Sequence, residues 1–126
     1  MKLVTFNILH GRTPGEDVDL GRFAQCVADL DADILALQEV DAVQPRSGMA
    51  DLTALAAEAM GARSHQFVAA IAGTPGATWI AATGEEQPGT AAYGVALLSR
   101  YPALTWQVVR LPRIPFRFPM YLGAPG

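Results

Sequence analysis

The chain has 126 residues, of which 51% are hydrophobic and 17% charged, and its formal net charge is −3. This composition excludes an intrinsically disordered chain, and the apolar runs, such as Ile34–Leu37 and Val95–Leu98, are far shorter than the roughly 20 residues that cross a bilayer. The acidic balance argues against sequence-independent nucleic-acid binding, which normally uses a basic face.

The first residues predict a strand that begins close to the N-terminus. They contain neither the long apolar segment nor the small-residue cleavage site of a secretory signal peptide. Cys26 is the single cysteine, so neither an intrachain disulfide nor a cysteine metal cluster is possible. Its apolar neighbours predict a buried thiol in a reducing compartment. We therefore expect a cytoplasmic protein without a transmembrane segment.

The first forty residues predict a strand, a helix and a second strand. Leu3–Leu9 is apolar or β-branched at nearly every position, which is typical of a strand buried on both faces. Apolar residues at helical spacing predict a helix over Leu20–Leu30, with Asp17 or Asp19 as its N-cap. Ile34–Val40 is the second buried strand. The crossover is long enough for parallel pairing, so both strands should end at the same edge of the sheet.

The rest of the chain predicts a second helix and antiparallel hairpins. The helix runs from about Asp51 to Met60, and Gly61 is a natural C-terminal cap. Turn-forming residues separate four short strand candidates. These are His65–Ala72, Thr78–Ala82, Tyr93–Ser99 and Leu104–Leu111. The segment from Pro112 onward predicts no regular element.

Two polar residues stand out at the ends of the first two strands. Glu39 ends an apolar strand, and Asn7 lies between Phe6 and Ile8. Each could simply face solvent or satisfy a structural hydrogen bond, because an unpaired buried polar group is costly. In open α/β sheets, however, ligands bind beyond the carboxyl ends of the strands. A carboxylate and an amide oxygen that converge there suit Mg²⁺ or Mn²⁺.

Three segments carry a family resemblance. They are Thr5–Gly11 (TFNILHG), Asp33–Asp41 (DILALQEVD) and Tyr93–Pro102 (YGVALLSRYP). In this order they resemble the endonuclease/exonuclease/phosphatase superfamily, which includes deoxyribonucleases, inositol polyphosphate phosphatases and neutral sphingomyelinases. The third segment departs from many bacterial members, which have asparagine where this chain has Val95.

The resemblance implies an α/β (α+β) fold, the first half of a four-layer α/β/β/α sandwich, in which mostly antiparallel strands follow the strand–helix–strand start. Residues 1–126 would form a partial domain that lacks its C-terminal half and is inactive alone. The implied activity is Mg²⁺-dependent hydrolysis of phosphoesters by water attack at phosphorus. The substrate would be a nucleic acid, a phospholipid, or a sugar or inositol phosphate. The resemblance makes Asn7 and Glu39 the catalytic and metal-binding residues.

Four further residues are candidates near this site. Arg46 follows the Glu39 strand, and its guanidinium would suit a substrate phosphate, although a solvated loop arginine is the simpler interpretation. His10 follows the first strand and could contact substrate, although it does not match the family's catalytic histidine. Asp41 could support Glu39 from the same strand face, and Tyr93 could stack or donate a hydrogen bond. The alternative to an enzyme is a non-catalytic α/β fragment or binding module that keeps the first half of the fold.

Overall fold

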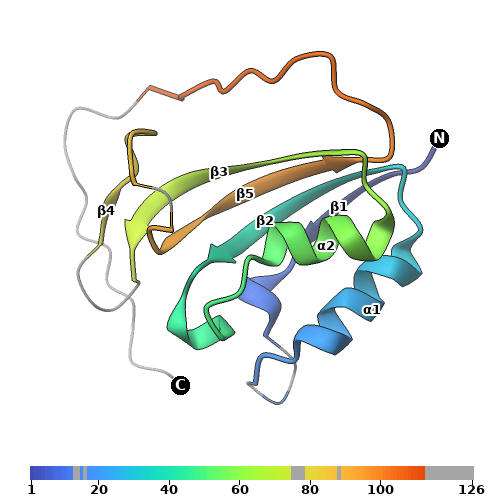
Figure 1. The fold of residues 1–126 in the computed structure, drawn as a ribbon, viewed down its shortest axis with the longest axis horizontal. Coiled ribbons are helices and arrows are strands. Elements are labelled where there is room, and N and C mark those ends of the chain that lie inside the picture. Colours follow the sequence, from blue (N-terminus) through green and yellow to red (C-terminus); the bar gives the residue numbers. More distant parts are fainter. Residues whose placement is uncertain (13–14, 16, 75–78, 88, 113–126) are drawn as a thin grey trace.

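One mixed β-sheet forms the centre of the fold, and both α-helices lie on the same face of it (Figure 1). The computed structural model describes residues 1–12, 15, 17–74, 79–87 and 89–112. The sheet has five strands in the order β1-β2-β5-β3-β4. The strands are β1 (Leu3–Asn7), β2 (Ile34–Ala42), β3 (Ser64–Gly73), β4 (Trp79–Ala81) and β5 (Ala92–Ser99).

The predicted strand–helix–strand unit is confirmed. β1 and β2 pair in parallel, with Asn7 opposite Gln38, and α1 (Leu20–Leu30) connects them. Of the two candidate caps it is Asp19 that caps α1, because its side chain accepts a hydrogen bond from the Arg22 N–H at 3.0 Å. The carboxyl ends of both strands therefore lie at the same edge of the sheet.

The second helix and three of the four predicted antiparallel strands are also confirmed. Asp51 caps α2 (Leu52–Met60), and Gly61 ends it with a left-handed φ of 68°. β5 pairs antiparallel with β2 on one side and with β3 on the other. Gly94 lies where β3 approaches closely, and a Cβ there would collide with the Val68 carbonyl oxygen. This position therefore needs glycine.

The hydrophobic core lies between the helices and the sheet face they cover. Its fully buried members include Val27 of α1, Leu35 of β2, Leu52 of α2 and Leu98 of β5. Burying such side chains stabilises the fold by about 1.5–3 kcal/mol each. No helix within the described residues is long and apolar enough to cross a membrane.

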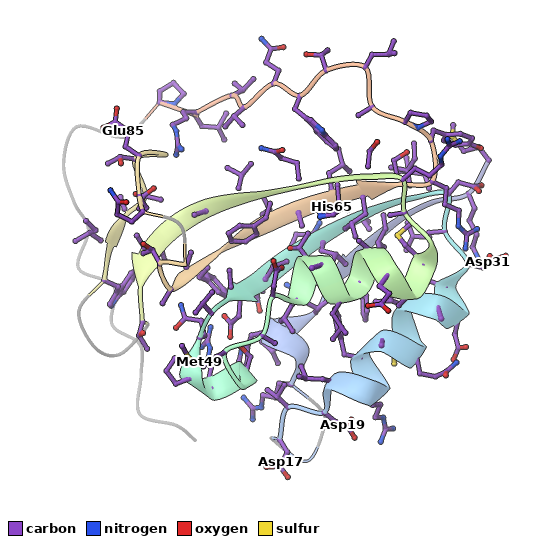
Figure 2. All side chains as sticks on the ribbon, in the orientation of Figure 1. Asp17, Asp19, Asp31, Met49, His65 and Glu85 are labelled. Carbon is purple, nitrogen blue, oxygen red and sulfur yellow. The ribbon has the colours of Figure 1, made fainter. Side chains whose placement is uncertain are left out.

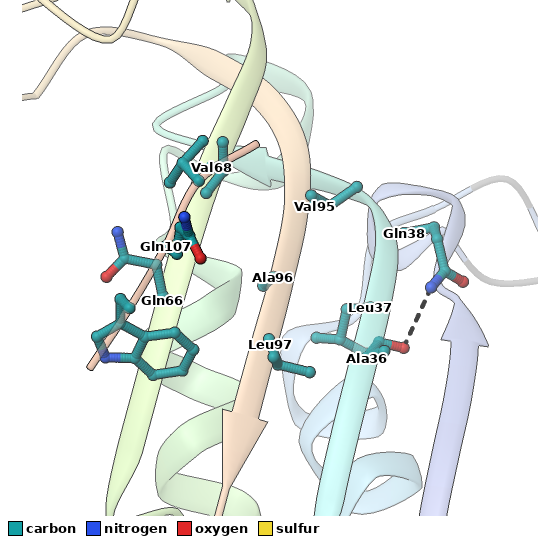
Figure 3. Close-up of a pocket in the computed structure, with 11 residues that line it drawn as sticks. Ala36, Leu37, Gln38, Gln66, Val68, Val95, Ala96, Leu97 and Gln107 are labelled. Carbon is teal, nitrogen blue, oxygen red and sulfur yellow. Dashed lines mark hydrogen bonds between the residues drawn. The ribbon is translucent and has the colours of Figure 1, made fainter. Parts of the chain in front are cut away.

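The opposite face of the sheet is covered differently, and we call it the open face. Ala36, Gln66 and Leu97 lie on it at paired positions of β2, β3 and β5. The extended segment 104–112 runs past this face, and side chains from both sides line a cavity of about 240 Å³ between them (Figure 3). No described helix lies on this side (Figure 1).

Three sequence predictions about burial and strands are wrong. β1 is not buried on both faces, since it is an edge strand whose Leu3 is 70% exposed. Leu104–Leu111 is not a strand, because within the described residues it pairs with no neighbour and runs as an exposed extended segment. Cys26 is exposed. It precedes the buried Val27 by one residue, a step of about 100° around the helix that turns its side chain away from the core.

Candidate metal and phosphate site

Asn7 ends β1 and shapes the turn that follows. Its Oδ1 accepts a hydrogen bond from the Leu9 N–H at 3.1 Å. Leu9 and His10 both have left-handed φ values, of 45° and 47°, so the chain turns sharply here instead of continuing as the predicted strand. The Asn7 side chain is exposed and on the open face, beside its parallel-strand partner Gln38. An amide oxygen has two lone pairs, so this one can bind a further partner.

Glu39 lies in a β-bulge at the corresponding end of β2. Leu37 pairs with Ala96 and Val40 with Gly94, so Gln38 and Glu39 together oppose the single residue Val95. Glu39 has a φ of 57°, in the left-handed region that favours glycine. Bulges re-aim side chains and are common next to active sites. The bulge also explains why Val40 packs in the core while Asp41 pairs with Tyr93 on the open face.

An ion pair with a buried carboxylate follows the bulge. The Arg46 guanidinium donates to both carboxylate oxygens of Asp41, with Nε–Oδ2 at 2.9 Å and Nη2–Oδ1 at 2.7 Å. The Asp41 side chain is 0% exposed, whereas 35% of the Arg46 side chain is exposed. The hydrogen bond to Asp41 raises the pKa of Arg46 above its ordinary value. Arg46 is therefore held in one orientation, and three of its five N–H donors are not used by Asp41.

Tyr93 lies beside this ion pair. The Arg46 Cζ atom lies 5.4 Å from the centroid of the Tyr93 ring, within the range of a cation–π contact. Burial, followed by the negative charge of Glu39, raises the pKa of Tyr93. The phenol is therefore kept neutral beside the Asp41–Arg46 pair.

His10 lies in the same electrostatic environment. Burial and then the positive charge of Arg46 lower the pKa of His10, and the carboxylates of Asp41 and Glu39 only partly oppose them. The neutral imidazole is therefore favoured over the cation. A contact from His10 to a phosphate would use an N–H donor and not a positive charge.

The donor set of this edge fits a magnesium-type ion. The described residues contain no group of three or more His, Cys, Asp or Glu side chains that could hold a metal. Mg²⁺ does not need such a group, because it usually takes one or two carboxylates and keeps several waters. The Glu39 carboxylate and the Asn7 amide oxygen are hard donors at the ends of neighbouring parallel strands.

The structure thus brings the four sequence-predicted residues to one edge of the sheet. Asn7 and His10 come from the end of β1 and the turn after it, and Glu39 and Arg46 come from the end of β2 and the loop beyond it. That edge is marked by Met49 in Figure 2, and the turn containing Asp31 lies at the opposite end of the molecule. The contact between Tyr93 and Arg46 depends on a strand register that the sequence does not reveal.

Comparisons with known proteins agree with this picture. Residues 4–125 match the model of the Endonuclease/Exonuclease/phosphatase family. The chain also resembles the crystal structure of an endonuclease/exonuclease/phosphatase from Beutenbergia cavernae DSM 12333, with a TM-score of 0.61 and 25% sequence identity. That alignment covers 81% of this chain but only 26% of the other, so the chain spans about a quarter of the length of this relative. Comparison with curated proteins gives no significant match. With this match over nearly its whole length, the chain belongs to the endonuclease/exonuclease/phosphatase family.

Proposed function

We propose that this chain carries the metal-binding edge of a metal-dependent phosphoester hydrolase. The observation that carries the proposal is the bulge of β2, which presents Glu39 beside the end of β1 in a chain that belongs to this family. A strained left-handed glutamate costs about 1–2 kcal/mol. Strain of this kind persists where surrounding structure enforces it, and it is concentrated at functional sites.

Glu39 and Asn7 would hold Mg²⁺ or Mn²⁺. When bound, the metal would polarise a phosphoryl oxygen and stabilise the negative charge that develops as water attacks phosphorus. Asn7 supplies its oxygen from a turn that its own hydrogen bond to the Leu9 N–H keeps fixed. Glu39 supplies the negative charge, from the bulge that lies at the end of β2.

Arg46 and His10 would bind the substrate phosphate. The Asp41 carboxylate uses two of the five N–H donors of Arg46, and the other three would contact the phosphate. The neutral His10 would add one N–H donor. These contacts recognise a phosphate and leave open which nucleic acid, phospholipid, or sugar or inositol phosphate bears it.

We further propose that the chain alone is not a complete catalyst. The described residues near Glu39 include one imidazole, that of His10, which does not match the catalytic histidine that the family resemblance implies. A general acid or base typically contributes 10²–10⁴-fold to the rate. We therefore expect the purified chain to bind metal without hydrolysing a phosphodiester above the blank rate.

Titration calorimetry with Mn²⁺ tests the proposal. Glu39→Gln removes the charge and keeps the shape, and it should weaken Mn²⁺ binding by more than tenfold, or more than about 1.4 kcal/mol. Glu85→Gln is the matched control, because Glu85 is exposed on the loop after β4 (Figure 2) and should leave the affinity unchanged.

The same titration separates the two candidate functions. A non-catalytic binding module that retains only the fold would give no Mn²⁺ binding, or binding that Glu39→Gln does not change. Hydrolysis of a phosphodiester by the chain alone, lost in Glu39→Gln, would support the metal site and contradict the proposed incompleteness.

A further inference from the structure

The loop after β2, which carries Arg46, is fixed to the ends of β3 and β5. Gln44 is fully buried, and its Nε2 donates to the Gly73 carbonyl at 2.7 Å and to the Ala92 carbonyl at 3.1 Å. The Gln44 carbonyl in turn accepts from the backbone N–H of Ser47 at 3.1 Å and from its hydroxyl at 3.2 Å. The backbone on both sides of Arg46 is therefore tied to the sheet.

The Asp41 carboxylate fixes one edge of the Arg46 guanidinium. The two bonds run from Nε to Oδ2 at 2.9 Å and from Nη2 to Oδ1 at 2.7 Å, and the Asp41 side chain is 0% exposed. The guanidinium also lies over the Tyr93 ring, with Cζ at 5.4 Å from its centroid. Hydrogen bonds in the plane and a ring beside it together restrict the guanidinium.

The planar shape of the guanidinium determines which donors are left. One forked edge is formed by Nε and Nη2, and a second, at the tip of the side chain, is formed by Nη1 and the other hydrogen of Nη2. Asp41 occupies the first edge. Among the described residues, none accepts a hydrogen bond from Nη1. A fork of this kind matches two oxygens of a phosphate.

We propose that Arg46 binds a phosphate group through the tip of its guanidinium, and that Asp41 is the positioning residue that holds this tip in place. The inference deepens the proposed substrate contact and rests on the proposed function for the identity of the anion. Asp41 thus acts through Arg46, because both oxygens of its buried carboxylate pair with the guanidinium. A fork that is already ordered loses less side-chain entropy when an anion binds.

Inorganic phosphate titrated into the intact chain in EDTA tests the proposal without a contribution from metal. The nitrogen NMR signals of the Arg46 side chain report which edge is used. The Nη1 and Nη2 signals should shift to saturation, and the Nε signal should shift less because its hydrogen stays on Asp41. No saturable shift at Nη1 and Nη2, or a larger shift at Nε, would overturn the proposal.

Arg46→Lys keeps the charge beside Asp41, so the chain should stay folded, but lysine has no fork. Phosphate affinity should fall about tenfold, as expected for the loss of one charge-assisted hydrogen bond. Arg63→Lys is the matched control, because Arg63 is exposed and precedes the first residue of β3, at the end opposite Gly73. Equal phosphate affinity in Arg46→Lys and the unmodified chain would show that the fork is not used.

Asp41→Asn separates positioning from simple charge. If Asp41 only reduced the positive charge around Arg46, removing it would raise phosphate affinity. A positioning role predicts that the affinity of the folded protein falls, and a rise would contradict it. If Asp41→Asn does not fold, the Nε hydrogen of the unmodified chain decides. Slow exchange with water supports the Asp41 anchor, and rapid exchange overturns it.

The source of the phosphate is compared with a dinucleotide, glycerophosphocholine and inositol phosphate. Arg46→Lys should weaken the binding of all three by a similar factor, because the fork contacts only the phosphate. A loss confined to one of them would overturn this assignment.

The Mn²⁺ titration of Glu39→Gln is independent of these measurements. If Glu39→Gln does not weaken Mn²⁺ binding while Arg46→Lys weakens phosphate binding, the metal-dependent function is wrong and the phosphate site stands. If Glu39→Gln weakens Mn²⁺ binding while Arg46→Lys leaves phosphate binding unchanged, the phosphate site is wrong and the metal site stands.

Discussion

At the scale of single residues, Asn7 has a structural contact and a proposed functional one on the same atom. Its Oδ1 accepts the Leu9 N–H and would also contact the metal. Asn7→Ala should lower the free energy of unfolding by about 1 kcal/mol, as loss of a comparable capping side chain does, and should also weaken Mn²⁺ binding. Asn7→Asp keeps an acceptor at this position and should preserve both properties. Urea unfolding and calorimetry measure the two effects separately.

Asn7 would be a structural residue only if Asn7→Ala greatly lowered the free energy of unfolding while the Mn²⁺ affinity of the folded protein stayed unchanged.

His10 gives a prediction about pH. Its folded pKa lies below the ordinary 6.5, chiefly because of burial and then Arg46. The unfolded chain therefore binds a proton at higher pH than the folded chain, so His10 reduces stability as pH falls below about 6.5 toward the folded pKa. An NMR titration of the imidazole should give a midpoint below 6.5. Arg46→Gln should raise it, because the cation is removed and Asp41 is freed. A midpoint at or above 6.5 in the unmodified chain would contradict this account.

At the scale of elements, the strands and helices with regular patterns could be predicted, and the bulge could not. The periodicity of Leu20–Leu30 and the β-branched runs before and after it report burial, which the local sequence encodes. The bulge at Gln38 and Glu39 arises from pairing with Val95, more than fifty residues away, and no local pattern specifies that register. The local sequence is also insufficient for β1. Its apolar pattern could not indicate that this strand lies at the edge of the sheet.

Asn7 and Glu39 could be identified from the sequence because polar residues interrupt apolar strands. The link from Asp41 through Arg46 to Tyr93 could not, since it depends on which strand lies beside β2 and on the loop that returns Arg46.

The left-handed φ of Glu39 predicts a conflict between stability and function in β2. Glu39→Gly should make the chain more stable than Glu39→Ala by about 1 kcal/mol, because glycine adopts this conformation without a Cβ clash. Both variants lack the carboxylate and should lose Mn²⁺ binding to the same extent. Chemical denaturation of the pair isolates the backbone effect. Equal stabilities, or a less stable glycine variant, would show that the bulge is not strained.

At the scale of the whole molecule, the open face exposes apolar side chains in the part of the chain that the structure describes. Val95 is 48% exposed and Leu97 is 42% exposed, and both line the cavity beneath segment 104–112 (Figure 3). Exposed apolar patches and free strand edges favour association. We predict that the purified chain binds a hydrophobic dye and self-associates with increasing concentration in sedimentation velocity.

A charged residue on this face should reduce that association. Leu97→Lys should lower both dye binding and self-association. Ala28→Lys, on the exposed side of α1, is the matched control and should change neither. A monomer at high concentration that does not bind dye would contradict this interpretation of the open face.

A divalent metal would bind where β1 and β2 end together. The most direct measurement is the paramagnetic broadening that Mn²⁺ produces in the amide NMR spectrum of the intact chain. Substoichiometric Mn²⁺ should first broaden the amides of Asn7, Ile8, Gln38 and Glu39, and Glu39→Gln should abolish this effect. Broadening centred on the acidic turn from Asp29 to Asp33, or broadening that persists unchanged in Glu39→Gln, would contradict it.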